Sequence, residues 1–168
     1  LLMNPSVACI DYADPSGGSG STLTYDVTTL TEGGANTGTI TGVATGTLSG
    51  DTFTVTGGVM TSGTHYFAAN VPTGLTVVVT GTSATTATIA FSGTATNHTN
   101  AYDVSNILIT FLDAAFSSGD AGTVGGAGET FSIDFNSPAG TLTYATTTFP
   151  EAAVNNGSIT TTSAITLS

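Results

Sequence analysis

A stretch of 28 residues occurs twice in this chain, and this repeat constrains the fold more than any other feature. Residues 22–49 align without a gap with residues 141–168, at an offset of 119 residues, and 14 of the 28 aligned positions are identical. Self-similarity at a long, fixed spacing indicates an array of similar structural units. The identical positions include Glu32 with Glu151, Asn36 with Asn155, Gly38 with Gly157, and Ile40 with Ile159.

A second, shorter match lies just upstream of each copy. Cys9-Ile10-Asp11-Tyr12 and Pro15 correspond to Ser132-Ile133-Asp134-Phe135 and Pro138, at an offset of 123 residues. A period of about 120 residues suits separate modules better than a solenoid, whose units are about 20–45 residues long. The two matches predict the last strand of a preceding module (1–15), a linker (16–21), one complete module (22–138), and the first strand pair of a following module (141–168).

The composition favours strands. The chain contains 37 Thr and 22 Gly. Thr is β-branched and suits a pleated strand, whereas Gly supplies turns. No apolar stretch has a sustained helical period, so we expect almost no helix. Alternating and apolar runs predict strands at 22–30, 39–49, 52–56, 64–68, 75–80, 86–91, 105–112 and 130–135.

Turn signals separate these strands about every 8–12 residues, which predicts a β-sandwich. The turn at 33–38 has a second copy that contains Asn156-Gly157, a pair typical of a type I′ hairpin turn. Residues 105–112 form the most apolar strand, so we expect that strand in the middle of a sheet. The strand patterns predict a core that includes Leu23, Tyr25, Val78, Ile89, Phe91, Ile107, Ile109 and Phe111.

Several short motifs in a fixed order support a family resemblance. They are Asn70-Val71-Pro72-Thr73-Gly74-Leu75-Thr76, Thr82-Ser83-Ala84-Thr85-Thr86-Ala87-Thr88, Asp103-Val104-Ser105-Asn106, and Phe111-Leu112-Asp113-Ala114-Ala115-Phe116. In this order they resemble the repeat of very large bacterial surface proteins that carry tandem Ig-like or Calx-β-like modules. The resemblance implies an all-β, immunoglobulin-like β-sandwich, a secreted cell-surface location, and an adhesive or structural role. The chain departs from that pattern because it lacks Lys and Arg.

The charge of the chain excludes some functions. There is no Lys or Arg, and 11 acidic residues give a formal net charge of −11. Binding to nucleic acid needs cations that displace phosphate counterions, and binding to anionic membrane surfaces needs them too. No apolar run of about 18 residues is present, so we expect no insertion into a membrane. The single cysteine, Cys9, cannot form a disulfide within the chain.

Calcium is the one cofactor that the acidic residues suggest. Oxygen ligands from loops suit Ca²⁺, but the sequence has no EF-hand loop, so solvated loop acids are the alternative. We expect no other cofactor. The calcium candidates are Glu32, Asp51, Asp103, Asp113 and Asp120.

Catalysis is not expected. His98, Asp103 and Ser105 could be drawn as a triad, but they fall within eight residues of one another. Catalytic triads take their members from separate structural elements. We therefore predict that the chain is not an enzyme. Two N-glycosylation sequons name Asn97 and Asn156 as candidates for modification.

The repeat predicts a structural protein, a repeat or subunit of a fibre assembled head to tail by strand sharing, and the resemblance implies that this fibre is extracellular, at the cell surface. Isolated hairpins and strands are marginally stable in water, so the outer segments need partners. We expect these partners to be copies of the chain or adjacent modules of the same chain. The alternative is an adhesin module that binds glycan or protein through exposed tyrosines. The expected assembly residues are Val7, Ile10, Tyr12, Leu142, Tyr144, Ile159 and Leu167.

The absence of Lys and Arg makes one prediction independent of the fold. Trypsin cleaves after these two residues, so the chain should stay intact under trypsin even when it is denatured. Mass spectrometry after prolonged digestion in denaturant checks this expectation. Tryptic fragments from within the chain would show that the sequence is wrong.

Overall fold

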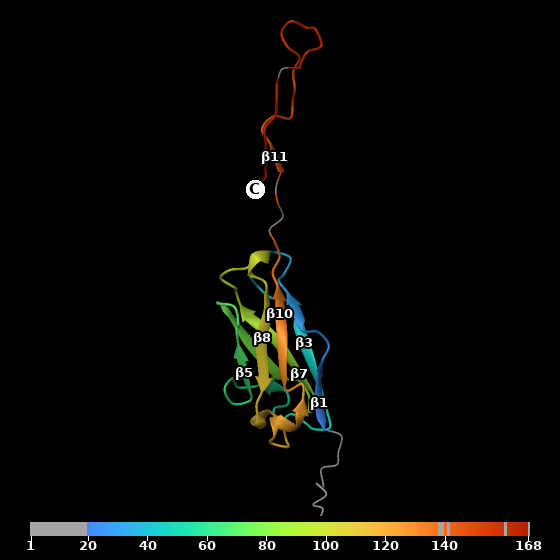
Figure 1. Cartoon of the computed structure of the whole chain (residues 1–168), viewed down its shortest axis with the longest axis vertical. Helices are drawn as coiled ribbons and strands as arrows, with labels where there is room; N and C mark the ends of the chain where they lie inside the picture. Colours follow the sequence, from blue (N-terminus) through green and yellow to red (C-terminus); the bar gives the residue numbers. More distant parts are fainter. Residues whose placement is uncertain (1–19, 138–139, 141, 160, 168) are drawn as a thin grey trace, which may run out of the picture. The chain divides into compact units, whose positions relative to one another are not determined.

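The computed structural model describes residues 20–137, 140, 142–159 and 161–167. They belong to two compact units, and the boundary between the units falls between Asn136 and Ser137 (Figure 1). We call the described residues up to Asn136 unit 1 and those from Ser137 onward unit 2. The segment 1–15, with Val7, Cys9, Ile10 and Tyr12, lies outside the described residues, as does most of the linker 16–21.

Unit 1 is all-β, as predicted, and its strands form two sheets that pack as a sandwich. One sheet has the order β4-β6-β7-β3-β1-β9, and the other has the order β2-β10-β8-β5. The strands are β1 (Ser21–Tyr25), β2 (Thr29–Thr31), β3 (Val43–Ser49), β4 (Gly58–Val59), β5 (Tyr66–Ala69), β6 (Leu75–Gly81), β7 (Thr86–Gly93), β8 (Val104–Phe111), β9 (Val124–Gly125) and β10 (Gly128–Asp134).

Helical structure in the described residues is limited to short 3₁₀ turns. These are η1 (Asn100–Tyr102), η2 (Asp113–Ala115) and η3 (Ala121–Thr123). The Thr-rich and Gly-rich composition agrees with this result, because both residue types disfavour long helices. Among the described residues, no helix has the length and apolar character needed to cross a membrane.

The strands with the clearest sequence patterns, β6, β7 and β8, lie where they were predicted. β6 and β7 form an antiparallel hairpin over their full length, from Leu75 opposite Gly93 to Gly81 opposite Ala87. β8 lies between β10 and β5, which confirms its predicted position inside a sheet. Its apolar sequence follows from this position, because an inner strand has no free edge and buries one whole face.

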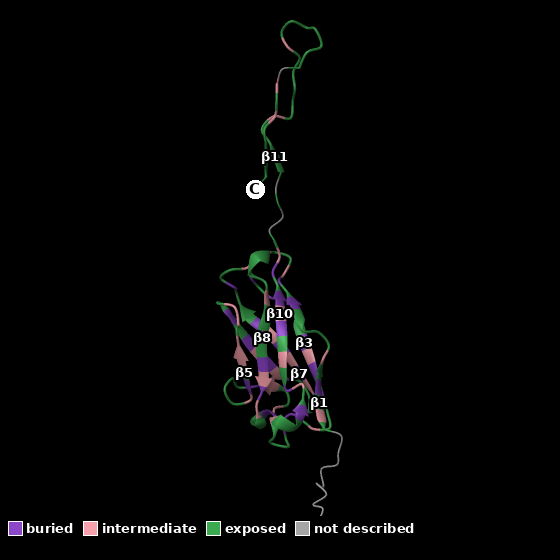
Figure 2. Cartoon of the chain, in the orientation of Figure 1, coloured by how far each residue is buried: buried purple, intermediate pink, exposed green. Residues whose placement is uncertain are grey.

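The core lies between the two sheets (Figure 2). Leu23, Ile89, Phe91, Ile107, Ile109 and Phe111 are buried as predicted. Tyr25 is only partly buried, and its ring packs edge-on against Phe131 at 5.3 Å. The prediction for Val78 was wrong, because Val77 and Val79 are the buried residues of β6. Three consecutive valines do not reveal which face is buried, and the pairing register decides it.

The predicted single strand 22–30 is wrong, because it is divided between the two sheets. β1 pairs with β3 in one sheet, whereas β2 pairs in parallel with β10 in the other. The chain crosses between the sheets at Asp26, whose Oδ1 accepts the backbone N–H of Val27 at 2.7 Å and of Thr45 at 2.6 Å. These bonds stabilise the crossing, and they leave Val27 exposed rather than in line with Leu23.

The predicted strand 52–56 is a loop with a single bridge, between Phe53 and Phe116. Phe53 is buried beside Phe111 and Phe116, with ring centroids 5.7 and 5.8 Å away. Burial of this ring holds the loop in place together with backbone hydrogen bonds, since the N–H of Phe53 donates to the carbonyl oxygen of Ala84 at 2.7 Å. The loop also crosses close over Gly81, where a Cβ atom would lie 1.9 Å from the carbonyl oxygen of Val55.

Unit 2 contains one antiparallel strand pair, β11 (Leu142–Tyr144) and β12 (Ile165–Leu167). Its turn is not of type I′ as predicted, because that type needs positive φ at Asn156 and Gly157 in succession. The positive φ values are instead 47° at Asn155 and 78° at Gly157. The same pattern occurs in unit 1, with 46° at Asn36 and 79° at Gly38.

The sheet crossing at Asp26 predicts a pH dependence. The backbone N–H of Thr45 is the main cause that holds the pKa of Asp26 below its ordinary value of 3.8. A lowered pKa in the folded state adds stability above the unfolded pKa, and this stability is lost as the pH falls through the folded pKa.

Replacement of Asp26 by Asn removes this titration but keeps an acceptor oxygen. We expect Asp26→Asn to lose less free energy of unfolding than the parent between about pH 5 and pH 2. The difference should stay below about 1 kcal/mol because the carboxylate is exposed to water. Urea unfolding followed by circular dichroism at several pH values measures it, and parallel pH profiles would contradict it.

Candidate functional site

One end of unit 1 contains a buried carboxylate, that of Glu32. Glu32 directly follows β2, forms an isolated bridge with Ile40, and has a side chain with 0% exposure. The turn between Glu32 and Ile40 needs Gly38, which has a φ of 79°. A Cβ atom at Gly38 would lie 2.6 Å from the carbonyl oxygen of Ala95. The backbone of this turn therefore stays close to the loop that follows β7.

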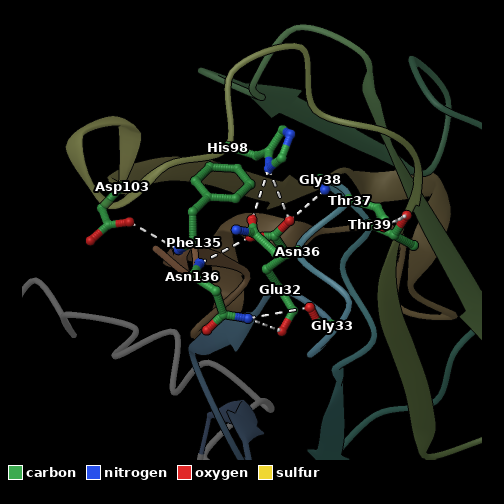
Figure 3. Close-up of polar contacts among 10 residues, drawn as sticks. All are labelled: Glu32, Gly33, Asn36, Thr37, Gly38, Thr39, His98, Asp103, Phe135 and Asn136. Atoms are coloured by element: carbon green, nitrogen blue, oxygen red, sulfur yellow. Dashed lines mark hydrogen bonds and ion pairs between the residues drawn. The ribbon is translucent and has the colours of Figure 1, made fainter. Parts of the chain in front are cut away.

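Donors from three separate segments surround the carboxylate of Glu32 (Figure 3). The backbone N–H of Gly38 donates to Oε1, and the backbone N–H of Asn136 donates to Oε2 at 2.9 Å. Nδ1 of His98 lies 3.1 Å from Oε1 and 3.1 Å from Oδ1 of Asn36. A buried carboxyl group requires such partners, and here they connect the turn, the loop after β7 and the end of β10.

The end of the last strand is held by further hydrogen bonds. Nδ2 of Asn136 donates to the carbonyl oxygens of Glu32 at 3.0 Å and of Gly33 at 3.3 Å. The backbone N–H of Phe135 donates to Oδ1 of Asp103 at 2.9 Å. We call Glu32, Asn36, Gly38, His98 and Asn136 the end cluster. It fixes the chain at the last residue of unit 1, immediately before unit 2 begins.

The calcium candidates lie at both ends of the sandwich. Asp103 precedes β8 and Asp113 follows it, so the length of that strand separates them. Within the ranges that the structure describes, no three or more His, Cys, Asp or Glu side chains form a group able to hold a metal ion. Asp113 accepts the backbone N–H of Ala121 at 2.9 Å, and Asp120 accepts that of Gly122 at 3.0 Å.

Asp51 also bonds to donors of its own loops. Its carboxylate accepts the hydroxyl of Ser118 at 2.7 Å and the backbone N–H of Thr52 at 2.7 Å. Partial desolvation raises the pKa of Asp51, but these hydrogen bonds outweigh it, so the pKa lies below its ordinary value of 3.8. The bond to Ser118 connects the loop after β3 to the loop after η2, which gives Asp51 a structural role in the fold.

The other residues singled out in the sequence lie apart from one another. Nδ1 of His98 contacts Glu32 and Asn36, whereas the carboxylate of Asp103 accepts the backbone N–H of Phe135. These hydrogen bonds do not join His98 to Asp103. The glycosylation candidates Asn97 and Asn156 are both exposed. The described assembly candidates are all exposed as well: Leu142, Tyr144, Ile159 and Leu167.

Unit 2 reproduces part of the end cluster. Glu151 bridges to Ile159 and accepts the backbone N–H of Gly157, as Glu32 bridges to Ile40 and accepts that of Gly38. Glu151 is exposed, however, whereas Glu32 is buried. Sequence reasoning named Glu32 only as a calcium candidate. The signal for its structural role was the repeat itself, which keeps the Glu, Asn, Gly and Ile of this turn in both copies.

The two glutamates form a matched pair for mutation. Gln at position 32 keeps the shape but replaces one acceptor oxygen by an NH₂ group, which leaves a buried N–H without an acceptor. We expect Glu32→Gln to lower the free energy of unfolding by about 3 kcal/mol. Glu151→Gln, at the equivalent exposed position, should change it by less than about 0.5 kcal/mol.

Denaturant titration of the full chain, followed by circular dichroism, measures both changes. The comparison separates burial from chemistry, because the residue, the substitution and the turn are the same in the two variants. An equal effect of the two substitutions would contradict a special role for the buried carboxylate.

This chain was also compared with known proteins. No protein-family model matches it, and no match was found among curated proteins or among solved structures. The interpretation of the end cluster therefore rests on the geometry of its own residues and on the internal repeat.

Proposed function

We propose that this chain is a repeating structural unit of an extracellular surface fibre. In such a fibre, sandwiches follow one another head to tail and share strands with their neighbours. One observation carries the proposal: unit 2 repeats the first strand pair of unit 1 in the same register. Leu142 pairs with Leu167 as Leu23 pairs with Leu48. A new first hairpin directly after a finished sandwich is the arrangement that a tandem array requires.

We further infer that the sandwich is immunoglobulin-like. One sheet contains the order β1-β3-β7-β6, and the other has the order β2-β10-β8-β5. Immunoglobulin sandwiches place strands A, B, E and D in one sheet and C, F and G in the other. The two orders correspond if β1 and β2 are two parts of strand A. The short strands β4 and β9 are additions to this pattern. The strand order supports the resemblance to tandem surface-protein modules.

The path of the chain through unit 1 supports a role in carrying tension. β1 begins beside β9 at one end of the sandwich, and β10 ends at the end cluster, at the opposite end (Figure 1). β2 and β10 are parallel, with Leu30 opposite Ile133. Hydrogen bonds between them run across the strands. A pull on the two ends of the unit would load these bonds together rather than one after another.

The composition supports a location outside the cell. The chain has no Lys or Arg, so proteases that need these residues cannot cleave it. Its cohesion does not depend on a disulfide within the chain, because only one cysteine is present. A large negative charge also keeps exposed repeats soluble. These properties suit a polymer that stays outside the cell, where it is exposed to proteases.

An adhesin module that binds glycan or protein is the second candidate, and one observation favours it. Tyr102 is 51% exposed and, with Asn97 and Pro72, lines a pocket of about 170 Å³. Aromatic rings with one polar tip are common at binding surfaces. Tyr66, in contrast, is buried, and its hydroxyl donates to the carbonyl oxygen of Val77 at 2.8 Å.

Electron microscopy of the purified protein separates the two candidates. The structural role predicts regular fibres whose axial repeat corresponds to one sandwich and its connection. The binding role predicts single particles together with a signal on a glycan array that Tyr102→Ala removes. Single particles with such a signal would overturn the structural proposal.

A further inference from the structure

Among the described residues, β11 and β12 form a two-stranded sheet with no further strand beside them, whereas the hairpin of unit 1 that they repeat is part of a sandwich. The strand pairing, the Glu–Ile bridge and the turn conformation of unit 2 match those of unit 1 residue by residue. Leu30 is 2% exposed in unit 1, whereas its counterpart Phe149 is 44% exposed in unit 2. Leu48 is 2% exposed, and its counterpart Leu167 is 73% exposed. The apolar side chains that unit 2 exposes therefore occupy positions that are packed in the core in unit 1.

Unit 1 shows which element covers this region. β10 lies parallel to β2, with Ile133 opposite Leu30, and its backbone continues to Asn136, whose N–H donates to Glu32. The counterpart of β2 in unit 2 is the segment 148–150, and the counterpart of Glu32 is Glu151. The missing partner of unit 2 is thus a parallel strand that carries an apolar residue opposite Phe149 and a backbone N–H that reaches Glu151.

The chain contains a second segment of this type. Cys9-Ile10-Asp11-Tyr12 matches Ser132-Ile133-Asp134-Phe135, and Ala13 then corresponds to Asn136. Residues 9–13 lie outside the described part of the chain. In this match, Ile10 corresponds to Ile133, and Tyr12 corresponds to the buried Phe135. Asn136 donates its main-chain N–H to Glu32, and Ala13, which corresponds to it, also has a main-chain N–H because it is not a proline.

We propose that residues 9–13 of a second copy of this chain add to unit 2 as a parallel strand beside residues 148–150. Ile10 packs opposite Phe149, and the N–H of Ala13 donates to the carboxylate of Glu151. Strand addition of this kind derives affinity from main-chain hydrogen bonds and specificity from side-chain positions. The inference rests on the proposed structural role, to which it adds the identity of the shared strand.

The order of the segments along the chain favours a second copy as the donor. Each copy carries one donor segment before unit 1, residues 9–13, and one acceptor hairpin after it, in unit 2. The two are therefore complementary from copy to copy, and a head-to-tail contact that does not close on itself produces a filament.

Two single substitutions in the full chain test this strand addition. Ile10→Asp removes the apolar residue of the donor, and Phe149→Asp removes that of the acceptor. Val59→Asp, at a position that is 65% exposed in unit 1, adds the same charge as a control. Sedimentation velocity should show the parent and the control as oligomers, and each of the other two variants as a monomer of about 16.5 kDa.

A mixture of Ile10→Asp and Phe149→Asp gives the decisive result. Each variant keeps one intact end, so the mixture should form heterodimers with twice the mass of one chain and nothing larger. A parent that is monomeric at all concentrations, single variants that assemble like the parent, or a mixture that stays monomeric would each overturn the strand addition. Fibres that persist in both variants would overturn it and leave the structural role standing, whereas single particles with glycan binding would overturn that role.

Discussion

Because the chain contains no Lys or Arg, its carboxylates can be stabilised within the protein only by N–H and O–H donors or by its two histidines. Hydrogen bonds from the backbone to a carboxylate are stronger than those between neutral groups. Asp26 holds the crossing between the two sheets in this way, and Asp103 holds the end of β10. Glu32 is the buried case, and its burial is possible only because donors from three segments meet there.

The location of Glu32 connects this electrostatic constraint to the architecture. Its carboxylate binds the last residue of unit 1, so the point where the sandwich is completed is also the point where the chain leaves it. β2 and β10 lie beside each other in the same sheet only because the first strand is divided at Asp26. The crossing and the end cluster therefore act together, since one places the partner of the last strand and the other secures its end.

The sequence predicted well the parts of the fold in which local pattern and tertiary environment agree. β8 and the β6–β7 hairpin were predictable because apolar alternation and turn residues mark them directly. The division of 22–30 was not, because Leu23, Tyr25 and Val27 alternate as in one strand and the crossing depends on a contact with Thr45. Phe53 was placed in a strand for a similar reason, since a single buried ring in a loop resembles a strand residue in sequence.

The candidate site was only partly predictable. The acidic residues of the loops were found, but their role was not, because a carboxylate that binds a cation and one that binds backbone N–H groups have the same local sequence. The hydrogen bond between Glu32 and Asn136 joins residues 104 positions apart, and the sequence around either residue gives no signal of it. The turn kept in both copies was the one available signal, and it marked the positions without showing what they contact.

The pairing of Tyr25 with Gly46 affects how the chain avoids misfolding. Two hairpins with half of their residues identical lie in one molecule, so either could compete for the same place in the sandwich as the chain folds. A Cβ atom at Gly46 would already lie 3.2 Å from Leu23 and 3.3 Å from the ring of Tyr25. Unit 2 carries Ile165 at this position, opposite Tyr144. In an exchange, Tyr144 would take the place of Tyr25, and the larger side chain of Ile165 beside it would crowd the edge-on ring contact with Phe131. This crowding penalises an exchange of the two hairpins.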